Sequence, residues 1–115
     1  MLNSKKIIIK HNINKDIVDF ISSNFNRVIV FTQKKIQDSS NIIIEMLISN
    51  YQAEIILLDD GENSKSIDSA MKSIGQLAQL SANKETLLIA YGGGSVSDHV
   101  GFVSSIFKRG IKYIN

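Results

Sequence analysis

LIAYGGGSVSDHVGFVSSIFKRG, residues 88–110, places three consecutive glycines between an apolar run and a segment with apolar side chains at helical spacing. The chain has 115 residues and only seven glycines, so three in a row is a marked concentration. The apolar run predicts a buried strand, and the spacing after the glycines predicts a helix that ends near Gly110. A glycine turn that joins a strand to a helix is typical of α/β domains.

The rest of the chain repeats this alternation. Continuous apolar runs predict buried strands, and segments with helical periodicity lie between them. The expected strands are 5–10, 27–32, 53–58, 85–91 and 111–115, and the expected helices begin after Asn14, at 35, near Ile67 and at Ser95. We therefore predict one domain, 1–115, with a doubly wound, mainly parallel, Rossmann-like sheet in three layers. The first strand is the one that could pair antiparallel at an edge.

The composition of the chain argues against several classes of protein, namely those that bind nucleic acid, associate with membranes or are secreted. The net charge of +2 gives no reason to expect nucleic acid or an anionic membrane as a partner. The chain has no cysteine, and its apolar runs are too short for a membrane-spanning helix or a signal peptide. We therefore expect a cytoplasmic protein. The sequence pattern stops at Asn115 inside or just after a strand, so we also expect the chain to be a piece of a longer protein.

Two polar segments follow strands and should open at the same edge of the sheet. The glycines at 92–94 precede a helix, whose free N–H groups would stabilise a phosphate, but a tight turn explains them equally well. The segment DDGENSKS, 59–66, carries Glu62 and Lys65, which suit a ribose or a phosphate. On its chemistry alone, this segment is better explained as a solvated loop before the next helix, with Ser64 or Ser66 as the N-cap.

Neither of two common nucleotide motifs is present. Gly92 and Gly94 fit the start of the dinucleotide fingerprint, but Ser97 stands where its third glycine belongs. The loop also lacks the Gly-Lys-Ser/Thr of a P-loop. An ordinary nicotinamide dehydrogenase and a nucleotide triphosphatase are therefore both unexpected.

The two segments together resemble 3-dehydroquinate synthase. That family has the pattern D-G-E-x-x-K-S, then L-I-A-x-G-G-G-x-x-x-D-x-x-G-F, then R-G-I. The matching residues are Asp60, Gly61, Glu62, Lys65, Ser66, Gly92, Gly93, Gly94, Asp98, Gly101, Phe102, Arg109, Gly110 and Ile111. The resemblance covers the chain as the family's amino-terminal domain and is strongest from Leu57 onward.

The resemblance implies an NAD-dependent lyase of the shikimate pathway, used in aromatic amino acid biosynthesis. Such an enzyme converts 3-deoxy-arabino-heptulosonate 7-phosphate to 3-dehydroquinate with loss of phosphate, and it uses zinc or another divalent metal. It implies cofactor contacts for Asp60, Gly61, Glu62, Lys65, Gly93, Gly94, Ser95 and Asp98. It also implies that Arg109 reaches the substrate phosphate across a homodimer interface.

This chain also departs from the family pattern. Gln33 and Lys35 replace the aspartate and asparagine that usually follow the second strand, and Ser97 replaces a glycine. The metal ligands and catalytic groups belong to a carboxyl-terminal domain absent here, so we assign no catalytic or metal-binding residue, His11 and His99 included. We expect no synthase turnover from this chain alone. The alternatives are a non-catalytic binding module, a related sugar-phosphate cyclase, or a relative of the glycerol and iron-dependent alcohol dehydrogenases.

Overall fold

The computed structural model describes residues 6–7, 15–39, 41–59, 67–107 and 111–115. Helices and strands alternate along these residues. They are β1 Lys6–Ile7, α1 Lys15–Asn24, β2 Arg27–Gln33, α2 Lys34–Ser39, α3 Asn41–Tyr51, β3 Glu54–Leu58, α4 Ile67–Gln79, β4 Thr86–Ala90, α5 Gly94–Phe107 and β5 Lys112–Ile114.

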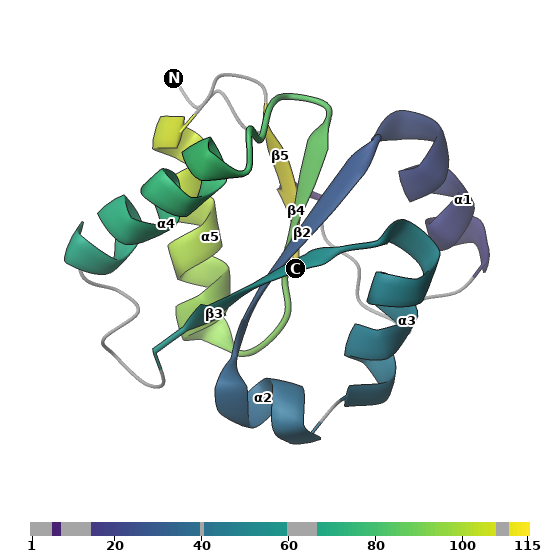
Figure 1. Ribbon diagram of the computed structural model, residues 1–115, viewed down its shortest axis with the longest axis horizontal. Helices are drawn as coiled ribbons and strands as arrows, with labels where there is room; N and C mark the ends of the chain where they lie inside the picture. The colour runs from purple at the N-terminus through teal and green to yellow at the C-terminus, as the bar shows by residue number, and fades with distance from the viewer. Residues whose placement is uncertain (1–5, 8–14, 40, 60–66, 108–110) are drawn as a thin grey trace.

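The five described strands form one sheet in the order β1-β5-β4-β2-β3, and every adjacent pair is parallel. Figure 1 shows α4 and α5 on one side of this sheet and α1 and α3 on the other. The predicted fold class, a doubly wound parallel sheet in three layers, is confirmed. β1 pairs parallel with β5 at the edge, so the antiparallel alternative for the first strand is excluded.

The two central strands, β2 and β4, are buried on both faces, which explains why their sequences do not alternate between apolar and polar residues. All five residues of β4 are buried, and so is β2 from Val28 to Gln33. Val28 and Val30 belong to the core beneath α1, while Ile29 and Phe31 belong to the core beneath α4 and α5. Because helices cover both faces of the sheet, both sets of side chains are shielded from water.

One expected element differs from the prediction. The helix expected over residues 35–50 corresponds to two helices in the structure, α2 Lys34–Ser39 and α3 Asn41–Tyr51. Serine and asparagine at 39–41 favour helix ends over helix interiors, because their side chains compete for main-chain hydrogen bonds. α2 begins directly after β2, at the carboxyl end of the sheet.

No helix among the described residues is both long enough and apolar enough to cross a membrane.

Candidate functional site

The central pair of strands, β2 and β4, marks the point where the chain changes direction across the sheet. From β2 the chain proceeds through α2 and α3 to β3, whereas from β4 it proceeds through α5 to β5 on the other side. The helices after these neighbouring strands therefore lie on opposite faces (Figure 1). In parallel sheets such a point leaves a crevice at the carboxyl ends of the strands, where ligands bind.

The three glycines that follow β4 do not share one role. Gly92 has a φ of 157°, and a Cβ there would lie 2.9 Å from Cγ2 of Val96. Gly92 is therefore required for packing against the first turn of α5. At Gly93 and Gly94, no described atom beyond the neighbouring residues lies within 4 Å of a Cβ position, and both residues are exposed. Packing among the described residues does not explain these two glycines.

The start of α5 supplies donors at this open surface. The N–H of Ser97 donates to the carbonyl of Gly93 across 3.1 Å, which begins the helical hydrogen-bonding pattern. The N–H groups of the first turn before it have no partner within a helix, and the helix dipole adds a partial positive charge there. α5 is 14 residues long, so its dipole is fully developed. The start of α5 thus offers hydrogen-bond donors and a partial positive charge to an anion.

Two buried polar side chains at the end of β2 hold the chain at the carboxyl ends of both neighbouring strands. The hydroxyl of Thr32 donates to the main-chain carbonyl of Tyr91 across 2.6 Å, just before the glycines. The side-chain amide of Gln33 donates from Nε2 to the main-chain carbonyl of Asp59 across 3.0 Å. The main-chain N–H of Tyr91 also donates to the carbonyl of Phe31 across 2.9 Å. β2 therefore fixes the chain where both neighbouring strands end.

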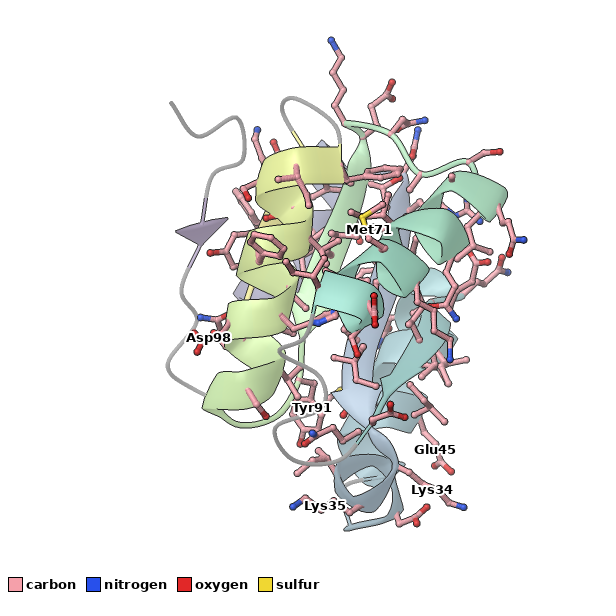
Figure 2. The ribbon with its side chains drawn as sticks, turned by 90° about the vertical axis from the view of Figure 1, so that its left-hand side faces the viewer. Lys34, Lys35, Glu45, Met71, Tyr91 and Asp98 are labelled. Atoms are coloured by element: carbon pink, nitrogen blue, oxygen red, sulfur yellow. The ribbon has the colours of Figure 1, made fainter. Side chains whose placement is uncertain are left out.

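The structure brings together only some of the residues expected to bind a cofactor. Gly93, Gly94 and Ser95 lie side by side at the start of α5. Asp98, one turn later, is exposed and lies on the side of α5 away from Tyr91 in Figure 2. Its negative charge, after burial, is the second cause that raises the pKa of Tyr113 on β5. Five further residues lie outside the described part of the chain: Asp60, Gly61, Glu62, Lys65 and Arg109.

Of the two histidines, only His99 lies in the described part of the chain. His99 is 3% exposed, lies 2.8 Å from Oγ of Ser73 through Nε2, and joins α5 to α4. His11 lies outside the described residues. Within the described part of the chain, no cluster of three or more histidine or acidic residues could hold a metal ion.

Sequence reasoning missed the roles of Thr32 and Val96. Thr32 looks like the last residue of an apolar strand, yet it holds a carbonyl that is 59 residues away in the sequence. Val96 is the side chain that makes Gly92 obligatory. The only local signal was that two polar residues, Thr32 and Gln33, end a buried strand.

Comparisons with known proteins converge on one family. The family model for the amino-terminal part of 3-dehydroquinate synthase matches residues 55–115. The chain is 33% identical to 3-dehydroquinate synthase of Clostridium tetani over 117 residues, which is 98% of this chain and 31% of that protein. The enzyme of Dictyoglomus thermophilum is also 33% identical, with the same coverage of both chains. The chain thus spans about a third of the length of these curated relatives.

A solved structure shows the same fold. The crystal structure of 2-deoxy-scyllo-inosose synthase complexed with carbaglucose-6-phosphate, NAD⁺ and Co²⁺ superposes with a TM-score of 0.67 and 20% sequence identity. The match covers 94% of this chain and 30% of that one. At this identity the likeness establishes the arrangement of helices and strands.

Proposed function

Since this chain belongs to the 3-dehydroquinate synthase family, we propose that it is the domain of such an enzyme that binds NAD through the glycine loop 92–94. The observation that carries the proposal is the contrast among the three glycines. Gly92 is required by packing, whereas Gly93 and Gly94 leave open space beside the first turn of a long helix. A pyrophosphate fills such a space and accepts hydrogen bonds from the N–H groups there.

The proposed role of the chain is to bind and orient the dinucleotide. NAD bound at this loop would supply reversible hydride transfer. The main-chain N–H groups of Gly94 and Ser95 would hold the pyrophosphate, while Thr32 keeps the loop at the end of β4. The parent reaction proposed is the conversion of 3-deoxy-arabino-heptulosonate 7-phosphate to 3-dehydroquinate. We propose Asp60, Gly61, Glu62, Lys65 and Asp98 as further cofactor contacts and Arg109 as a ligand of the substrate phosphate.

A titration of the 115-residue chain with NAD, followed by NMR, tests this proposal. We expect amide shifts at residues 92–98 and a dissociation constant in the millimolar range, about 4 kcal/mol. Gly94→Val should abolish the response by filling the space for the pyrophosphate. Gly75→Val is the matched control, because Gly75 on α4 is also exposed with open space at its Cβ position. Shifts that survive Gly94→Val, or none at high NAD, would leave the loop as a structural turn.

We also propose that the parent protein is a homodimer and that α4 and α5 form its contact. Four large apolar side chains are exposed on these adjacent helices, and contiguous patches of this kind are typical of interaction surfaces. They are Ile67, Met71, Phe102 and Ile106. Figure 2 shows Met71 directed toward the space between α4 and α5. Asp68 and Lys72, both exposed one turn apart on α4, have opposite charges, so this face can pair with itself about a two-fold axis.

The oligomeric state measured by light scattering tests the contact. Phe102→Glu should convert a dimer into a monomer, because a carboxylate would be buried without a partner. Phe20→Glu is the control, since Phe20 is exposed to a similar extent on α1, at the opposite face of the sheet. A dimer that tolerates Phe102→Glu would place the contact elsewhere.

A further inference from the structure

A hydrogen bond between two buried side chains joins α5 to α4, its neighbour on the same side of the sheet (Figure 1). Nε2 of His99 lies 2.8 Å from Oγ of Ser73, and the two residues are 3% and 1% exposed. Either atom can donate, according to which ring nitrogen carries the proton. Loss of this bond would be costly, because water does not reach these atoms to replace it. The contact between α4 and α5 therefore includes a bond with a preferred length and direction.

The valines that hold α5 against the sheet make contacts with little directional preference. Val96, Val100 and Val103 are fully buried in the core shared with β2 and β4. His99 stands among them on the buried face of the helix, and its ring centroid lies 6.1 Å from that of Phe31 on β2. Apolar contacts depend on the area removed from water more than on direction. The bond from His99 therefore opposes a small rotation of α5 about its axis more directly than the valines do.

The same face of α5 leads to the glycine loop. Val96 precedes His99 by three residues, so the two side chains are neighbours on the helix surface. Cγ2 of Val96 lies 2.9 Å from the Cβ position of Gly92. A rotation of about 20° would move the main chain of α5 by up to about 0.8 Å, since its Cα atoms lie about 2.3 Å from the axis. The length of an N–H···O bond varies by only about 0.5 Å, so such a rotation is enough to misdirect the donors of the first turn.

Resting on the proposed function, we infer that His99 is a positioning residue of the dinucleotide site. Its bond to Ser73 fixes the rotation of α5 and thereby the direction of the main-chain N–H groups at Gly94 and Ser95. Because its side chain is buried, His99 acts through the helix and not by contact with the dinucleotide.

NMR titration of the 115-residue chain with NAD⁺ tests this role. Ser73→Ala should weaken NAD⁺ binding about fivefold, the lower end of the range typical of coupling between two sites. It should also shift the amide resonances of residues 93–97 before NAD⁺ is added. His99→Leu, which has no hydrogen-bonding atom in its side chain, should do the same. His99→Gln should restore both readouts, because Nε2 of glutamine is as many bonds from Cα as Nε2 of histidine.

Val103→Ala is the matched control. Val103 is also buried on α5, one turn further from the loop than His99. Its truncation leaves a cavity that lowers stability without removing the bond to Ser73. Urea unfolding should show this loss, while NAD⁺ affinity and the amides of residues 93–97 should stay unchanged. A loss of affinity equal to that in Ser73→Ala would overturn the inference.

Two further results would also overturn it. If Ser73→Ala lowers stability but leaves NAD⁺ affinity and the amides of residues 93–97 unchanged, the bond only stabilises the contact between the helices. If the effects of Ser73→Ala and His99→Leu on affinity add in the double variant, the two side chains act independently. Both results leave the dinucleotide site intact. By contrast, if NAD⁺ does not perturb residues 92–98 of the unmodified chain, the proposed function itself fails.

Discussion

The hydroxyl of Thr32 donates a hydrogen bond to the main-chain carbonyl of Tyr91 across 2.6 Å, and Thr32 is fully buried. The bond joins the end of β2 to the residue that immediately precedes the glycine loop. A valine has nearly the same shape as a threonine but no hydroxyl, so it would leave the Tyr91 carbonyl without this donor. The position of the loop therefore depends on a side chain from the neighbouring strand.

Thr32→Val should destabilise the chain by about 1–2 kcal/mol and weaken dinucleotide binding as well. Thr86→Val is the control. Thr86 is also buried, and its Oγ1 accepts a hydrogen bond from the N–H of Asn83 across 3.2 Å, at the other end of β4. Urea unfolding and NAD titration of both variants check the prediction. An equal loss of binding in the two variants would mean that Thr32 acts only through general stability.

Substitutions at two positions of the glycine loop should affect different properties, stability at Gly92 and dinucleotide binding at Gly93. Gly92→Ala should lower the free energy of unfolding by about 1–3 kcal/mol, because its Cβ would press on Val96 at a positive φ. Gly93→Ala should leave stability nearly unchanged, since its Cβ position is open, yet it should reduce affinity for a dinucleotide. Thermal unfolding and NMR titration measure the two effects. A destabilised Gly93→Ala with unchanged binding would contradict this division of roles.

A side chain from β5, Tyr113, explains why a glycine stands at position 101. A Cβ at Gly101 would lie 2.9 Å from the hydroxyl oxygen of Tyr113 and 3.4 Å from its Cζ. Alanine normally stabilises a helix by about 1 kcal/mol relative to glycine, so the contact opposes that gain. Gly101→Ala should therefore not stabilise the chain by itself, whereas in the Tyr113→Phe background it should. A double-mutant cycle on unfolding free energies measures the difference, and additive effects would show that the two residues do not interact.

The sheet could be predicted from the sequence because its central strands, β2 and β4, are buried on both faces. Such strands are continuous apolar runs, as in Thr86–Ala90, and every run was separated from the next by a helical pattern. The break between α2 and α3 was missed because Ile43 and Leu47 continue the apolar spacing of Ile36. There the local preference of residues 39–41 for helix ends outweighed the periodicity.

The sequence predicts which region of the sheet holds the site, but not the role of each residue in it. The sequence indicates that the glycine loop belongs at the carboxyl edge, because that follows from parallel topology alone. It does not distinguish Gly92 from Gly93, since the distinction depends on where the Val96 side chain points. Nor does the sequence show that the side chain of Gln33 donates a hydrogen bond to the carbonyl of Asp59. That bond depends on the register of β2 against β3, which local sequence does not determine.

Alkaline pH should destabilise the folded chain through two tyrosines. Burial, followed by the charge of Asp98, raises the pKa of Tyr113, and burial, followed by the charge of Asp19, raises the pKa of Tyr51. A pKa that is higher in the folded state favours the neutral phenol there. This stabilisation is fully present below the ordinary value, about 10, and is lost as the pH rises through the raised value.

The free energy of unfolding should therefore fall above about pH 10, and Tyr113→Phe should make this fall shallower because phenylalanine does not ionise. Asp98→Asn should also make it shallower, by removing one of the two causes that raise the pKa of Tyr113. Asp38→Asn, a change at another exposed carboxylate, should leave the curve as it is. Urea unfolding at about pH 8, 10 and 11 gives the pH dependence for the unmodified chain and for each of the three variants. Identical slopes in the unmodified chain and in Tyr113→Phe would show that the phenol of Tyr113 titrates alike in the folded and unfolded states.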